Sequence, residues 1–369
     1  MNDIGISGEL GGNSKRRCVE EDATDRLSHL PVFVIHHILS FLDTKSAVQT
    51  SVLSRVWRFA WKHVPVLSFR SGSFDQYSSF QSFVGNVVSL RDPVGDVVGK
   101  ISYIDNEGSD ELDCELFGKV IKYALSHDTH HLVVDTNSTS CSCDYSFSDL
   151  FGTISSCNLT TLELQSVLID EAFAHSGFGM LTTLNLELCE LEYDLDEYLD
   201  PLSGCPCLQN LVLNHCSHFV KISGPQLLRL TLDCVYCDPW EQIEIFAPRL
   251  KFLSLLPELE DMKFSKLSIP CLDHVDIRVT DTNDFLEGNE ECVGQRFISL
   301  FEYLNNAISL TLGPHTIRVL SGMTEFLEQQ PSSPFRRLKT LIMEADSVPY
   351  ALINYFLKGS SMKPNLEFV

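Results

Sequence analysis

The chain has 369 residues, more than one compact hydrophobic core usually supports, so we expect more than one structural unit. Its net charge is −23, and no apolar run approaches the roughly 18 residues that span a bilayer. Charge is uneven: residues 1–24 sum to −2, residues 25–70 to +4 and the remainder to −25. An acidic body argues against nucleic acid and anionic membrane surfaces as partners, because both are bound through lysine and arginine.

Residues 1–24 are predicted to form a disordered tail, because they are rich in glycine, serine and charge and lack the apolar core of a signal peptide. Thirteen cysteines without a secretion signal favour a reducing compartment, which here means the nucleus, the cytoplasm or both. Some cysteines form close pairs, but none has a second pair at zinc-finger spacing, so we predict no metal and no cofactor. These pairs are Cys141/Cys143, Cys205/Cys207 and Cys234/Cys237.

Residues 25–70 predict three short helical segments. Leu30-Pro31 opens the first, since proline suits the first helical turn. Apolar residues then recur at helical spacing and give one stripe, formed by Ile35, Ile38, Leu39 and Leu42.

The second and third segments follow directly. Thr44 is predicted to cap the second, in which Val52 and Leu53 are apolar. Ser54 is predicted to cap the third, which carries Trp57 and Trp61 on one face. Some forty-five residues cannot bury this much apolar surface alone, so the segment is interpreted as a docking module. The alternative is an ordinary helical subdomain whose apolar face is core.

The segment resembles an F-box, in the version found in plant F-box proteins with leucine-rich repeats. The resemblance rests on DRLSHLP, I-x-x-I-L-S-F-L, DTKSAVQTSVLS and W-x-x-x-W followed by V-P-V-L-S-F. It implies contact with an acidic Skp-type adaptor, which links the F-box to a cullin and a RING subunit of a ubiquitin ligase. The residues that the resemblance assigns to forming or supporting this contact are Leu30, Pro31, Ile35, Ile38, Leu39, Leu42, Val52, Leu53 and Trp57.

Two positions depart from the family pattern. The family carries acidic residues after Leu-Pro, whereas this chain has Val32 and Phe33. It carries two basic residues before the first tryptophan, whereas this chain has Arg55 and Val56. Loss of the acidic residues removes charge favourable to a helix N-terminus, worth about 0.3–1 kcal/mol.

Beyond residue 70 the theme L-x-x-L-x-L recurs, as in LTTLEL at Leu159 and LTTLNL at Leu181. Successive central residues lie 22, 27, 19, 23 and 22 residues apart, mostly within the range of a leucine-rich repeat. These are Leu162, Leu184, Leu211, Leu230, Leu253 and Val275, followed by weaker copies at Leu310 and Leu341 and preceded by degenerate ones at Ile101 and Leu132.

Each L-x-L places two side chains on one face of a short strand, and stacked repeats bury that face in a continuous core. We therefore predict an α/β protein: a three-helix F-box over residues 25–70, then a leucine-rich-repeat solenoid over 71–369 with a parallel sheet on its concave face. A generic α/β domain with leucine-rich strands is the alternative, but six copies at near-constant spacing disfavour it.

After Val279 the repeats lose regularity. The acidic run DTNDFLEGNEECVGQRF is interpreted as a loop, and insertions of this kind are often on the binding side of a solenoid. The last residues, YALINYFLKGSSMKPNLEFV, resemble the helix and strand that precede an FBD region in relatives, and the sequence ends within that strand. We read this as a truncated C-terminus without an FBD region.

No nucleotide-binding, metalloprotease or hydrolase motif is present, so a non-enzyme is expected. The first hypothesis is a subunit of an SCF-type E3 ubiquitin ligase, whose F-box binds the Skp-type adaptor and whose solenoid recruits an unknown target protein. The alternative is a repeat scaffold whose F-box no longer works in a ligase, motivated by Val32, Phe33 and Val56. A small-molecule receptor is a third class, but no basic cluster of the kind such relatives use is evident.

Overall fold

The structure is a computed structural model. It describes residues 27, 29–91, 98–105, 114–136, 145–152, 158–192, 200, 202–219, 221–236, 242–258, 264–280, 290–330, 333–345, 347–359 and 364–368. The predicted tail over residues 1–24 lies outside these ranges. None of the described helices is both long enough and apolar enough to cross a bilayer.

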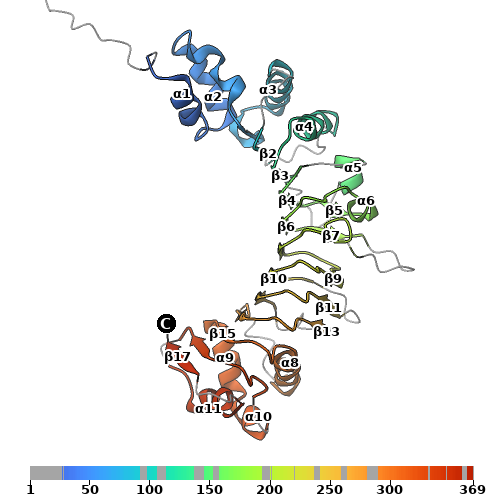
Figure 1. The fold of residues 1–369 in the computed structure, drawn as a ribbon, viewed down its shortest axis with the longest axis vertical. Helices are drawn as coiled ribbons and strands as arrows, with labels where there is room; N and C mark the ends of the chain where they lie inside the picture. Colours follow the sequence, from blue (N-terminus) through green and yellow to red (C-terminus); the bar gives the residue numbers. More distant parts are fainter. Residues whose placement is uncertain are drawn as a thin grey trace, which may run out of the picture.

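Across the described residues, twelve strands form one parallel sheet that lines the inner side of an arc (Figure 1). In spatial order they are β1 (Val66–Arg70), β2 (Lys100–Ile104), β3 (His131–Asp135), β4 (Thr161–Gln165), β6 (Thr183–Glu187), β8 (Asn210–Asn214), β10 (Arg229–Asp233), β12 (Phe252–Leu256), β14 (His274–Ile277), β15 (Ser309–Leu312), β16 (Thr340–Met343) and β17 (Asn365–Phe368).

The predicted repeat centres align in a single column across this sheet. Leu162 pairs in register with Leu132 on one side and Leu184 on the other, and the same residue-to-residue pairing continues along the stack. The full central column is Leu67, Ile101, Leu132, Leu162, Leu184, Leu211, Leu230, Leu253, Val275, Leu310, Leu341 and Leu366. Alternation of buried and accessible residues along strands such as β4, β8 and β10 turns this column toward the core, which confirms the leucine-rich-repeat fold.

The outer side of the arc is covered by helices and by two small sheets (Figure 1). The helices there are α3 (Tyr77–Leu90), α4 (Cys114–Ser126), α5 (Phe147–Phe151), α6 (Glu171–Ala174) and α8 (Glu290–Tyr303). The small sheets are β13 (Phe264–Ser268), β11 (Ile243–Phe246) and β9 (Lys221–Ser223), and β5 (Leu168–Ile169) with β7 (Glu190–Leu191). The last elements are α9 (Pro314–Gly322), α10 (Thr324–Gln329) and α11 (Tyr350–Gly359).

The N-terminal segment forms α1 (Val32–Leu39), α2 (Thr44–Gln49) and the 3₁₀ helices η1 (Thr50–Val52) and η2 (Trp57–His63); a further 3₁₀ turn, η3 (Ser71–Ser73), follows β1. The third predicted segment is therefore a 3₁₀ helix rather than an α-helix. The V-P-V-L-S-F stretch, assigned to the F-box from sequence, contributes β1 to the repeat sheet. The boundary at residue 70 stays a prediction.

Three details of the predicted elements are wrong. Asp43, not Thr44, caps α2, because its Oδ1 accepts the Ser46 N–H at 2.7 Å. Ser54 caps nothing, since its buried hydroxyl has no hydrogen-bond partner among the described residues. The acidic run after Val279 is not a loop throughout, because its second half opens α8, in which Val293 and Phe297 are buried. The predicted helix and strand at the C-terminal end are confirmed as α11 and β17.

Candidate functional site

Three of the nine predicted adaptor-contact residues lie inside the protein. Ile35 and Leu39, one turn apart on α1, are fully buried, and Trp57 of η2 is 3% exposed. The Trp57 Nε1–H donates a hydrogen bond to the Leu27 carbonyl at 3.1 Å, which ties the start of the segment to η2. Their burial places these three side chains beneath the surface of the segment.

The other six predicted residues lie nearer to solvent. Leu30 and Leu42 are half-buried against the core, whereas Pro31 and Ile38 are exposed. Val52 is 85% exposed and Leu53 is 51% exposed, the first on η1 and the second directly after it. The predicted single stripe is therefore divided, with Ile35 and Leu39 facing inward and Ile38 outward.

Sequence reasoning missed the most prominent exposed aromatic side chains of this segment. Phe33 and Phe41 are 74% and 76% exposed, and Phe59 on η2 is 56% exposed. A signal was available, since residues 32–35 of α1 are all apolar, and a helix that is apolar all round must be covered on more than one side.

Exposed apolar side chains concentrate in this part of the chain. Seventeen large hydrophobic residues are exposed among the described residues, and nine of them lie between residues 27 and 59. They come from α1, η1, η2 and the residues that flank these elements, and η2 packs directly against both α1 and η1. We call this set the apolar F-box surface: Leu27, Val32, Phe33, Ile38, Phe41, Val52, Leu53, Val56 and Phe59.

The charged residues around this surface are mainly basic. Arg58 and Lys62 lie 5.5 and 5.7 Å from the centre of the Phe59 ring, on neighbouring turns of η2. Such cation–π pairs keep positive charge next to an exposed aromatic ring. The arrangement favours an acidic partner with apolar side chains of its own.

A buried arginine fixes the helical segment to the repeats. The Arg91 side chain, 3% exposed at the end of α3, donates to the Trp61 and Val64 carbonyl oxygens at 3.1 and 2.8 Å. Its Nε donates to the Tyr123 hydroxyl of α4 at 2.9 Å. One guanidinium thus joins the end of η2 to the first two helices of the outer layer.

Among the described residues, the strand positions that face the concave side are mainly polar, and on them an arginine lies against an aromatic ring. Along the row formed by the first residues of the strands, the Arg229 guanidinium lies 3.9 Å from the centre of the Phe252 ring, and His274 follows in register. Arginine and aromatic residues are enriched at protein-binding hot spots. This group is the clearest candidate contact on the concave face.

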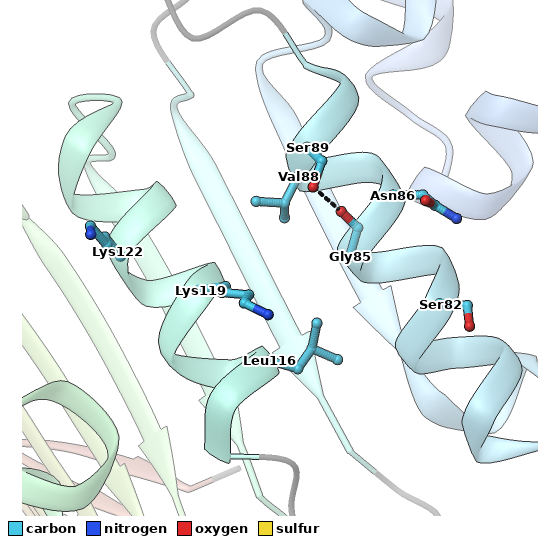
Figure 2. A pocket seen from close by; sticks show the side chains of 8 residues that line it. All are labelled: Ser82, Gly85, Asn86, Val88, Ser89, Leu116, Lys119 and Lys122. Atoms are coloured by element: carbon cyan, nitrogen blue, oxygen red, sulfur yellow. Dashed lines mark hydrogen bonds between the residues drawn. The ribbon is translucent and has the colours of Figure 1, made fainter.

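A groove of about 540 Å³ lies on the outer side between α3 and α4 (Figure 2). Lys119 and Lys122 line it from α4, and Ser82, Asn86 and Ser89 line it from α3. The Ser89 hydroxyl donates to the Gly85 carbonyl, and Lys119 pairs with Glu115 at 2.8 Å, so both are already engaged. The groove is open and does not bring together an acid, a base and a nucleophile.

One of the three close cysteine pairs, Cys205/Cys207, lies wholly within the described residues. Cys205 is buried while Cys207 is exposed, and both Cys141/Cys143 and Cys237 lie outside the described residues. Burial, with Cys216 beside it, raises the pKa of the Cys189 thiol well above its ordinary value. The buried thiols of Cys189 and Cys205 behave as small apolar core groups.

Comparison with known proteins identifies a family for the N-terminal segment and relatives over most of the chain. Residues 27–69 match the F-box domain family. F-box/LRR-repeat protein 25 of Arabidopsis thaliana is 30% identical over 239 residues, covering 63% of this chain and 86% of that protein. A putative F-box/LRR-repeat protein of the same plant is 29% identical over 329 residues, 85% of this chain and 65% of its own length.

An F-box/FBD/LRR-repeat protein of Arabidopsis thaliana is also similar, at 29% identity over 291 residues, 75% of this chain and 61% of its own. The chain spans between 62% and 66% of the length of three such curated relatives. The helical segment and the repeats define an F-box protein with a leucine-rich-repeat solenoid. The chain belongs to the F-box/LRR-repeat family of plants.

Proposed function

We propose that this protein is the target-recruiting subunit of an SCF-type ubiquitin ligase. The apolar F-box surface binds a Skp-type adaptor, and through it a cullin and a RING subunit, while the concave face of the repeats binds a target protein. The subunit performs no chemistry itself. It raises the concentration of the target near the ubiquitin-carrying enzyme.

The observation that carries this proposal is the concentration of exposed apolar side chains between residues 27 and 59. Isolated surface leucines need no explanation, but a set gathered on three packed helical elements marks an interaction site. The net charge of +4 over residues 25–70 complements an acidic adaptor, because opposite charge favours encounter and orientation.

The proposal is tested by co-purifying the full chain with a Skp-type adaptor and measuring the dissociation constant. Val52→Asp is the variant of choice, because Val52 is 85% exposed and the change leaves the core intact. We expect affinity to fall at least tenfold, since the new charge would be desolvated within the proposed contact. Leu90→Asp on α3, at a residue that is 55% exposed, is the matched control and should bind as the wild type does. Absence of wild-type binding, or equal loss in both variants, contradicts the proposal.

Val32 and Phe33 favour a second candidate function, a repeat scaffold that does not enter a ligase. Both side chains are exposed at the start of α1, where acidic residues would complement the helix N-terminus. This function predicts that a variant with Val32→Glu and Phe33→Glu binds the adaptor far more tightly than the wild type. Equal binding by the two chains would remove the reason to consider it.

A further inference from the structure

A ladder of left-handed residues follows the strands of the central repeats. Ser166, Leu188, His215 and Cys234 have φ of 58°, 51°, 49° and 45°, and each comes directly after a strand of the large sheet. Each N–H donates to the carbonyl of the last residue of the next strand, as His215 N does to Asp233 O at 2.8 Å. We call these four residues the left-handed ladder.

The ladder brings chemically distinct side chains to neighbouring positions. His215 and Cys234 occupy successive places on it, separated by one strand spacing of roughly 4.8 Å. Asp233 is the residue before Cys234. A nitrogen of His215, an oxygen of Asp233 and the sulfur of Cys234 all lie within 4.8 Å of one another.

We propose that His215, Asp233 and Cys234 form a binding site for Zn²⁺. Zinc accepts sulfur, imidazole nitrogen and carboxylate oxygen together, at about 2.0–2.3 Å, whereas Ca²⁺ and Mg²⁺ take oxygen ligands. Ligand atoms around tetrahedral zinc lie roughly 3.3–3.8 Å apart. The three atoms here lie within 4.8 Å of one another, which is close to that spacing. Binding releases the thiol proton of Cys234 to solvent.

Two neighbouring groups support this assignment. The Tyr236 hydroxyl lies 3.4 Å from His215 Nδ1, and the two rings stack, which orients the imidazole as groups behind metal ligands do. Asn214 pairs in register with Asp233, and its Oδ1 is shielded from solvent without a hydrogen-bond partner among the described residues. Asn214 also directly precedes His215 in the chain, and an unsatisfied shielded oxygen is a group that a cation could satisfy.

The site joins two consecutive repeats, because His215 follows β8, whereas Asp233 ends β10 and Cys234 follows it. His215 precedes the other two ligands by about one repeat in sequence, so no short cysteine or histidine motif predicts the site. Zn²⁺ would act there as a clip on the carboxyl-terminal edge of the sheet. The proposed zinc site does not depend on the proposed ligase role, and each proposal can be contradicted without affecting the other.

The test uses Co²⁺ as a spectroscopic substitute, added to the reduced full chain in which Cys207, Cys271 and Cys292, the exposed described cysteines, are serine. We expect one equivalent to give the visible bands of four-coordinate cobalt and a sulfur-to-cobalt charge-transfer band, both removed by Zn²⁺. Cys234→Ser should abolish the charge-transfer band. His215→Gly should weaken binding at least tenfold, and because glycine adopts a φ of 49° freely, misfolding would not explain the loss.

Two matched controls decide the outcome. Leu188→Gly makes the same change one ladder position earlier, and Cys216→Ser removes a buried thiol beside the site; both should bind Co²⁺ as the wild type does. Zn²⁺ should also raise the melting temperature of the wild type and of Leu188→Gly but not of His215→Gly. Wild-type binding by His215→Gly, or equal loss in Leu188→Gly, would overturn the site.

Discussion

Four successive residues of the left-handed ladder hold a backbone conformation that costs energy in any residue except glycine. For L-residues this region is less favourable by roughly 1–2 kcal/mol. None of the four is glycine, although each is also held by a hydrogen bond to the next repeat. The ladder therefore combines local strain with regular stacking.

Substitution at Leu188 measures that strain. The side chain is 47% exposed, so its loss removes little packing. We expect Leu188→Gly to be more stable than Leu188→Ala by about 1 kcal/mol, because glycine relieves the left-handed strain and alanine does not. In an exposed helix alanine is instead more stable than glycine by a similar amount, so the sign of the difference distinguishes the two backbone conformations. Urea denaturation of the two variants provides the measurement, and a more stable Leu188→Ala would show that the strain is absent.

At the scale of elements, a side chain crosses one strand to join two others. Arg278, after β14, donates to both carboxylate oxygens of Glu344, after β16, at 2.7 and 2.6 Å. It passes over Gly313, where an added Cβ would lie 2.9 Å from Arg278 Cγ. Hydrogen bonds from Glu344 and Asp276 hold the pKa of the Arg278 guanidinium above its ordinary value.

A double-mutant cycle with Arg278→Met and Glu344→Gln should give a coupling energy of about 0.5–1 kcal/mol. This coupling energy is small because the side chains of Arg278 and Glu344 are 39% and 25% exposed, so solvent screens the pair. Raising the salt concentration from about 0.05 M to about 1 M should reduce it, as screening shortens to roughly 3 Å. The Lys119–Glu115 pair, exposed on α4, is the control and should show no measurable coupling. A larger coupling there than at Arg278 would contradict this account.

The sheet could be predicted at the level of single residues. In L-x-L the two leucines must share a face, so Leu162, Leu184 and Leu211 could pair in only one register without exposing a strand's core residues. The long insertions were harder, because helix α8 begins in a run of acidic residues whose apolar positions become frequent only after Val293. In that segment, burial of Phe297 and Phe301 in the tertiary core stabilises the helix.

Predicting the candidate sites from sequence was possible only in part. The F-box motif identifies Ile35, Leu39 and Trp57, but these side chains are buried and not on the surface. A sequence motif marks the positions that the fold needs. Phe41 belongs to no helical stripe, and its exposure depends on where α1 ends. His215 and Cys234 come together only through the stacking of two repeats.

On the scale of the whole molecule, one hydrophobic cluster runs from Ile35 to Phe356, so the F-box and the repeats share a core. Repeats nevertheless contact chiefly their neighbours, and stability in such proteins is the sum of local terms. The Thr44 hydroxyl, which accepts the Ser68 N–H at 2.7 Å, connects α2 to the edge strand β1. A substitution at Thr44 should therefore perturb only the N-terminal end of the repeat sheet.

Thr44→Val should leave the Ser68 N–H without its acceptor, at a cost of about 1–3 kcal/mol. We expect amide hydrogen exchange in α2 and β1 to accelerate together, because the two elements open as one unit. Exchange in β8, β10 and β12 should stay unchanged, since several repeats separate them from the substitution. Acceleration throughout the sheet would show that the whole molecule unfolds as a single cooperative unit.

The three hydrogen bonds of Arg91 determine more than attachment. They hold the end of η2 against α3 and α4. The concave face therefore has a fixed orientation relative to the apolar F-box surface. A protein bound to the concave face would therefore have a fixed distance and orientation relative to the apolar F-box surface. A flexible linker between the two parts would instead allow many positions. Reach would then depend on the curvature of the arc, and insertion or deletion of one repeat would redirect the bound protein by a discrete step.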